Sequence, residues 1–183
     1  MKHSLPGIKT TLPAKQWHLS ETGRFRCNLL AEKISPYSPD TIVSSPEPKA
    51  RETAQIVADN FHLSVDVVHG LREHNRDNYL WAKKEEFEQD VANFFKFPHL
   101  LVMGQETADQ AHNRFVAAIN SVIEKYPVGN IVVIAHGTVI TLFVSRLFEL
   151  EAFTFWERLG MPSFVVLSLP QWELVTVVED VEA

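Results

Sequence analysis

The chain has 183 residues, of which 45% are hydrophobic and 22% are charged, as in ordinary globular proteins with a buried core. Lys and Arg number 17 against 23 Asp and Glu, so a formal net charge of −6 excludes a generally basic nucleic-acid surface. Neither a membrane-spanning apolar run nor a secretory signal is evident, so we expect a cytoplasmic protein without nucleic-acid or membrane partners. The single cysteine, Cys27, rules out an internal disulfide, and no Cys/His spacing resembles a zinc site.

Apolar segments of strand length alternate along the chain with longer segments of helical period. Helices are expected at about 20–34, 48–60, 85–95, 107–126, 139–148 and 153–159. Strands are expected at 40–44, 65–68, 130–135, 163–169 and 172–178, of which the last two form an antiparallel hairpin. The alternation predicts a three-layer α/β fold, with a mostly parallel central sheet and helices on both faces. No repeat or linker divides the chain, so we expect a single domain over residues 1–183.

Four polar clusters stand where ligands collect in open α/β sheets, just beyond the carboxyl ends of the strands. They are Lys2-His3-Ser4, the segment SSPEPKARETA at 44–54, Leu71-Arg72-Glu73-His74, and His136-Gly137-Thr138. Taken singly, each has an ordinary explanation: Lys49 as a solvated helix residue, Glu73 as a loop charge, and His136 as a core histidine. Their shared position in the topology favours one common site instead.

This set of motifs resembles the histidine phosphatase superfamily (branch 1), also called the phosphoglycerate mutase-like family, from Lys2 to about Thr141. The most specific match is SSPEPKARETA, which is similar to the family's Ser-Ser-Pro segment and has Lys49 at the arginine position. Lys2-His3-Ser4 is similar to the Arg-His-Gly motif around the nucleophile. The remaining matches are Leu71-Arg72-Glu73 to the acid-bearing segment, Gly104-Gln105-Glu106-Thr107 to a Gly-Glu-Ser-like turn with one extra residue, and IVVIAHGT to the strand before the second histidine.

The resemblance implies a phosphoric monoester hydrolase of the histidine acid phosphatase type, acting on a small soluble phosphomonoester. His3 would be the nucleophile, because a neutral imidazole can attack phosphorus. Glu73, with a raised pKa, would protonate the leaving group and then activate water. Lys2, Lys49 and a protonated His136 would hold the phosphoryl oxygens, so neither a metal nor an organic cofactor is required. Lys9, where many members carry Asn, is either a further cation or an exposed loop residue.

The chain departs from the family pattern in two ways. Both expected arginines are lysines, at Lys2 and Lys49, and lysine lacks the planar fork that arginine offers a phosphate. We therefore expect weaker or differently selective catalysis. In addition, only Met1 and Lys2 precede His3, although a central strand needs more than two residues. We expect a truncated first strand, with the native chain beginning upstream; the alternative is a sheet built without that strand.

Several other functions remain open from the sequence. Phosphoglycerate mutase-type phosphoryl transfer is a rival within the same class, but no second phosphate site is apparent. A catalytically silent phospholigand-binding module fits the two lysines and the short N-terminus, whereas the presence of both His3 and Glu73 speaks against it. A protein-phosphohistidine phosphatase is a further alternative. The segment at about 72–102, with Tyr79 and Trp81 near its start, is expected to form a cap-like insertion that suits a small substrate better.

Overall fold

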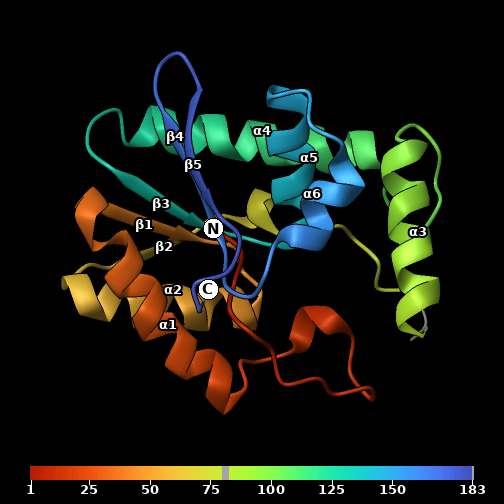
Figure 1. The fold of residues 1–183 in the computed structure, drawn as a ribbon, viewed down its shortest axis with the longest axis horizontal. Helices are drawn as coiled ribbons and strands as arrows, with labels where there is room; N and C mark the ends of the chain where they lie inside the picture. The colour runs from red at the N-terminus through yellow and green to blue at the C-terminus, as the bar shows by residue number, and fades with distance from the viewer. Residues whose placement is uncertain (80–82, 183) are drawn as a thin grey trace.

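A parallel three-stranded sheet lies between two layers of helices in the computed structural model, which describes residues 1–79 and 83–182 (Figure 1). The strand order is β2-β1-β3, with bounds Thr41–Ser44 for β1, Val65–Val67 for β2 and Ile131–Ile134 for β3. In the register of the sheet, Ile42 lies opposite both Val65 and Val132. Farther along, β4 (Phe164–Ser168) and β5 (Glu173–Val178) form the expected antiparallel pair.

Helices cover both faces of the sheet, so the expected three-layer architecture is confirmed (Figure 1). On one face lie α1 (Glu21–Ile34) and α2 (Pro48–Phe61). On the other face lie α4 (Ala108–Lys125) and α5 (Gly137–Leu147), followed outward by α6 (Ala152–Arg158) and α3 (Lys84–Lys96). Short 3-10 turns span Ala14–Gln16, Ser35–Tyr37 and His69–Leu71.

The helix boundaries follow from local side-chain chemistry. Ser20 caps α1 by accepting a hydrogen bond from the Gly23 N–H, and Thr107 caps α4 by accepting one from the Gln110 N–H. The Gln110 side chain returns a bond to the backbone of Thr107, which completes a capping box. Pro48 occupies the first turn of α2, where its missing N–H costs nothing.

The first three residues take the place of a central strand beside β3. The His3 N–H donates to the Ala135 carbonyl at 3.0 Å, and the Ala135 N–H donates to the Met1 carbonyl at 2.9 Å. On the opposite side, the Lys2 N–H donates to the Ser163 carbonyl at 2.9 Å. These bonds join β3 to the β4–β5 pair and place His3 at the carboxyl end of the sheet. The first strand is as short as the sequence predicts.

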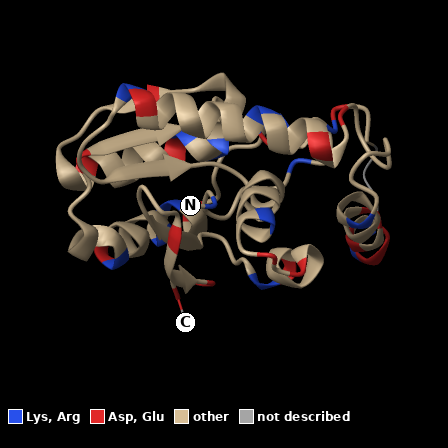
Figure 2. Ribbon diagram, turned by 90° about the horizontal axis from the view of Figure 1, so that it is seen from above, with Lys and Arg blue, Asp and Glu red and all other residues tan. Residues whose placement is uncertain are grey.

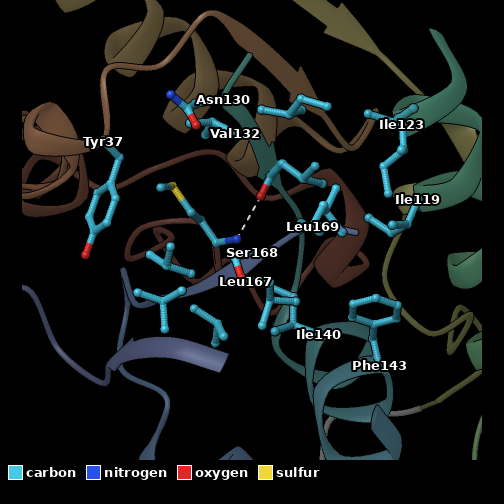
Figure 3. Close-up of a pocket in the computed structure, with 18 of the residues that line it drawn as sticks. Tyr37, Ile119, Ile123, Asn130, Val132, Ile140, Phe143, Leu167, Ser168 and Leu169 are labelled. Atoms are coloured by element: carbon cyan, nitrogen blue, oxygen red, sulfur yellow. Dashed lines mark hydrogen bonds between the residues drawn. The ribbon is translucent and has the colours of Figure 1, made fainter. Parts of the chain in front are cut away.

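A cavity of about 560 Å³ lies beyond Met1, between β3 and β4. Its walls are mainly apolar and include the side chains of Tyr37, Ile119, Ile140 and Phe143 (Figure 3). The Met1 ammonium lies in this wall and donates to the Val133 carbonyl at 2.7 Å. The cavity therefore borders the strand that carries His3, but it is separate from the polar clusters.

Charged residues of both signs are distributed over the helices and loops (Figure 2). None of the helices within 1–79 and 83–182 is at once long enough and apolar enough to cross a membrane.

Candidate active site

His3 is buried, with 6% of its surface exposed, and one of its ring nitrogens forms a hydrogen bond within the protein. Nδ1 lies 2.7 Å from the Ser4 carbonyl oxygen, which can only accept a hydrogen bond. The proton therefore resides on Nδ1, and Nε2 keeps its lone pair. Burial above all, and then electrostatic interaction with His136 and Lys49, hold the pKa of His3 well below its usual value. The ring is thus neutral at pH 7, as a nucleophile requires.

The loop that carries His3 is fixed by contacts to two helices. The Ser4 N–H donates to Thr53 Oγ1 of α2 at 3.0 Å, and the Ser4 hydroxyl donates to the Gly23 carbonyl of α1 at 2.7 Å. At position 23, a Cβ would lie 2.1 Å from the Leu5 carbonyl oxygen, so only glycine lets α1 come this close. These contacts of Ser4, Thr53 and Gly23 could not be predicted from the sequence, because the partners are distant along the chain.

His136 follows β3 and lies beside His3, with ring centroids 5.0 Å apart and the rings inclined by 64°. It is fully buried, and its Nε2 lies 2.7 Å from Ser45 Oγ. Burial above all, and then Lys49, hold the pKa of His136 well below its usual value, despite the opposing effect of Glu73. The expectation of a protonated His136 is therefore wrong for the unliganded site, because burial in a cationic neighbourhood disfavours the charged ring.

The Glu73 carboxylate faces the N-terminal turn of α5. It accepts hydrogen bonds from the N–H groups of Thr138 at 3.2 Å, Val139 at 3.3 Å and His74 at 2.9 Å. Burial raises the pKa of Glu73, but Arg76, His136 and the His74 N–H together outweigh burial, and the pKa is lowered. The expected raised pKa is therefore wrong for the unliganded site, in which these donors stabilise the ionised carboxylate.

Arg114 of α4 fixes the loop that carries Glu73. Its guanidinium donates to the carbonyls of Gly70 at 2.7 Å, Arg72 at 2.9 Å and Glu73 at 3.2 Å. The same guanidinium pairs with Glu106 at 2.5 Å, and Glu106 also accepts from the Asn75 N–H at 2.8 Å. The turn around Glu106 is visible in the sequence, whereas the contacts of Arg114 to the Glu73 loop give no local signal because those carbonyls are 41 to 44 residues away.

The two lysines at the arginine positions are each engaged by the protein itself. Lys2 Nζ donates to the Leu159 carbonyl at 2.5 Å, and Lys49 Nζ donates to the Ala14 carbonyl at 2.8 Å and to the Glu47 carboxylate at 2.5 Å. Burial, partly opposed by Glu73, lowers the pKa of Lys2 to about 8. Lys9 lies in an exposed loop, so the structure does not bring it into the buried cluster.

Glu47 is a member of this cluster that was not predicted from the sequence. One carboxylate oxygen accepts from the Glu73 N–H at 2.8 Å and lies 3.5 Å from His136 Nε2. The other oxygen pairs with Lys49. The signal was present as the acidic residue two positions before Lys49, inside the most specific motif.

The segment at 72–102 contributes α3, whose Val91 and Phe94 are buried in the core on the side of α4 and α5. Tyr79 packs against Phe87 of α3, with ring centroids 6.1 Å apart, and donates a hydrogen bond to Asp90. Trp81 lies outside the described residues. A cap-like role for the segment stays a prediction. Within the described part of the chain, no group of three or more His, Cys, Asp or Glu side chains could hold a metal ion.

The family model of the histidine phosphatase superfamily (branch 1) matches residues 12–176. An uncharacterized phosphatase, PhoE, from Bacillus subtilis is 24% identical over 139 residues, which is 76% of this chain and 66% of that protein's length.

Solved structures of two phosphatases share the fold. A mycobacterial glucosyl-3-phosphoglycerate phosphatase superposes with a TM-score of 0.77 at 20% identity, over 98% of this chain and 96% of that one. A phosphoserine phosphatase mutant from Entamoeba histolytica, with phosphoserine bound, superposes with a TM-score of 0.76 at 17% identity, over 97% and 93% of the two chains. With a family model that matches most of its length, this chain belongs to branch 1 of the histidine phosphatase superfamily.

Proposed function

We propose that the protein hydrolyses a small soluble phosphomonoester through a phosphohistidine intermediate on His3. The observation that carries the proposal is the state of the His3 ring, whose Nδ1 is committed to the Ser4 carbonyl at 2.7 Å. Nε2 is thereby left as a neutral, oriented nucleophile beside His136. Orientation of an attacking atom is a large part of the catalysis of group transfer.

In the first step, the Nε2 lone pair attacks phosphorus, and the new N–P bond forms as the bond from phosphorus to the ester oxygen breaks. Lys2, Lys49 and His136 stabilise the charge on the phosphoryl oxygens. Glu73 gives its proton to the departing alkoxide. In the second step, Glu73 takes a proton from water as that water attacks phosphorus; the N–P bond breaks, inorganic phosphate leaves, and His3 is restored. Neither step needs a metal ion, because side chains supply the positive charge.

The ionised state of Glu73 in the free site adds a requirement to this mechanism. Before it can act as an acid, Glu73 must gain a proton, and the negative charge of an arriving phosphate raises the pKa of a neighbouring carboxyl. We propose that substrate binding itself brings Glu73 into its protonated form.

A small substrate is supported by the relatives, because the named phosphatases of similar fold act on glucosyl-3-phosphoglycerate and phosphoserine. A silent phospholigand-binding module is the second candidate. The observation in its favour is that both lysines are already bonded, Lys2 to the Leu159 carbonyl and Lys49 to Glu47.

One experiment separates the two functions. The purified protein is incubated with an aryl phosphate in EDTA, and phosphate release is measured for the wild type, for His3→Ala and for His99→Ala, which alters an exposed histidine. We expect release by the wild type and by His99→Ala only. Rapid quenching should trap an acid-labile phosphate on the wild type. An equal adduct on His3→Ala would rule out His3 as the nucleophile, and phosphate binding without any turnover would establish the silent module.

A further inference from the structure

Glu47 places a carboxylate inside the cluster to which the proposed mechanism assigns phosphate binding. The residue lies between the two serines and Lys49 of the SSPEPKARETA segment, and only 9% of its surface is exposed. A buried carboxylate is costly unless partners compensate its charge. The partners of Glu47 therefore indicate where the protein stabilises an anion.

Three groups face the Glu47 carboxylate. Lys49 Nζ lies 2.5 Å from one oxygen. The other oxygen accepts from the Glu73 N–H at 2.8 Å and lies 3.5 Å from His136 Nε2. A fixed ammonium, a backbone donor and an imidazole thus converge on one anionic group, and two of the three belong to residues that would hold phosphoryl oxygens.

From this geometry we infer that Glu47 is a built-in competitor of the phosphoryl group for Lys49 and His136, and so determines the affinity of the site for phosphate. The inference rests on the proposed function. A phosphate and the Glu47 carboxylate repel each other at contact distance, and each needs the same Lys49 ammonium. Substrate binding must therefore displace Glu47 from Lys49 or neutralise it, and either change costs binding free energy.

The competition also bears on the exchange of arginine for lysine at position 49. Lys49 Nζ has three protons, of which one is directed at the Ala14 carbonyl and another at Glu47. An ammonium shared in this way offers a phosphate little until Glu47 withdraws. Lysine at this position is expected to lower the affinity for phosphate, and Glu47 lowers that affinity further. Removal of the carboxylate charge should restore part of the affinity.

The test compares phosphate and vanadate affinity at pH 7 by calorimetry and by competitive inhibition. Glu47→Gln keeps the shape of the side chain without its charge. Glu47→Asp keeps the charge, and Glu52→Gln removes a charge from the outer side of α2, where Glu52 pairs with Arg24 and His18. We expect Glu47→Gln to bind both anions on the order of tenfold more tightly or better, because one close repulsion is removed. Glu52→Gln should stay near the wild type, and Glu47→Asp, which keeps the repulsive charge, should not share the gain in affinity.

A purely structural role for Glu47 predicts a different result, because loss of a partner for buried Lys49 would lower the melting temperature without tighter anion binding. The rise in melting temperature with added phosphate is therefore measured for every variant as a second readout of affinity. Equal or weaker anion binding by folded Glu47→Gln would overturn the inference and leave the proposed function intact. If neither the wild type nor Glu47→Gln binds either anion, the proposed function fails together with the inference.

Discussion

At the scale of single residues, the ionisation of the site depends on hydrogen bonds that only the folded chain provides. The Glu73 carboxylate accepts from three backbone N–H groups, two of them in the first turn of α5. These bonds hold both oxygens in place before any substrate arrives. A carboxylate at a helix N-terminus is also favoured by the helix dipole. Glu73 is thus positioned and charged in the unliganded site, and under the proposed mechanism it becomes an acid only when a phosphate is bound.

The proposed role of Glu73 as proton donor predicts that the effect of its loss depends on the leaving group. Glu73→Gln keeps the hydrogen-bonding oxygen but cannot supply the proton, so turnover of alkyl phosphates should fall on the order of 10²-fold or more. An aryl phosphate with an acidic phenol needs little protonation and should lose far less. Steady-state kinetics on both ester types measure the difference, with Glu85→Gln, which alters an exposed residue of α3, as the control. Equal losses for the two esters would refute the acid role.

The lowered pKa of Lys2, about 8, predicts how anion binding varies with pH. Below pH 8 the Lys2 side chain is charged and attracts an anion, whereas above pH 8 the neutral amine predominates and the attraction is lost. Competitive inhibition by sulfate should therefore weaken as the pH rises from 7 to 9. Sulfate keeps the same charge over this range, so the change belongs to the protein. Lys2→Arg stays charged throughout, and its sulfate inhibition should be flat; an unchanged slope in that variant would exclude Lys2 as the titrating group.

At the scale of elements, the position of the Glu73 loop is set by α4 rather than by the loop itself. The Arg114 side chain of α4 donates to three carbonyls of that loop. It is only 15% exposed, and the side chain of its partner Glu106 is 11% exposed. A second ion pair of α4, between Asp109 and Arg146, is more exposed, at 42% and 34%. The two arginines provide a matched comparison between a pair that positions the site and one on the surface.

We expect Arg114→Ala to lower kcat on the order of 10²-fold, because a small displacement of a catalytic group has that effect. Its free energy of unfolding should also fall by about 3–5 kcal/mol, since Glu106 loses the nearer of its two arginine partners. Arg146→Ala should change stability by about 1 kcal/mol or less and leave kcat unchanged. Denaturant unfolding and steady-state assays measure both quantities. Similar kcat values for the two variants would show that Arg114 does not position Glu73.

The elements were predictable because their signals are local. Ser20, Pro48 and Thr107 mark helix starts, and the apolar stretch at Ile131–Ile134 marks a strand, without reference to the rest of the chain. The candidate site was predictable as a set of clusters at strand ends, and its residue roles stay predictions. The charge states of Glu73 and His136 were not predictable, because burial and distant partners such as Arg76 determine them. The role of Arg114 was not predictable either, because the carbonyls that it binds are distant in sequence.

At the scale of the whole molecule, the cavity between β3 and β4 lies between the three-stranded sheet and the β4–β5 pair, beside Met1. Val133 and Val165 line it from the two sides, and the Met1 ammonium lies in its wall. Burial lowers the pKa of this ammonium to about 5, so folding favours the neutral amine over the charged form that an unfolded chain carries up to about pH 8. The sheet is therefore held together at this point by a group that is poorly suited to burial.

A chain engineered with five valines before Met1 should be more stable than the same chain with five glycine and serine residues there. The valines can pair along β3 and fill apolar space, and each kcal/mol gained raises Tm by about 2–4 °C. Both extensions replace the buried amine by an amide. Their advantage over the present chain should therefore grow as the pH falls from 8 to 5, where protonation of the unfolded amine opposes folding. Thermal unfolding at pH 5 and 8.5 tests both effects, and equal Tm values for the two extensions would show that the cavity accepts no strand.

The short strand β2 has a consequence for how copies of the molecule meet in concentrated solution. β2 has three residues at one edge of the sheet, and its central Asp66 accepts hydrogen bonds from Lys125 and Tyr126. A short edge strand with a charged residue is a poor template for the backbone of another chain. The strand β5 is twice as long and exposes Leu174 and Val175. Aggregation through strand pairing should therefore begin at β5, while the β2 edge is protected against it.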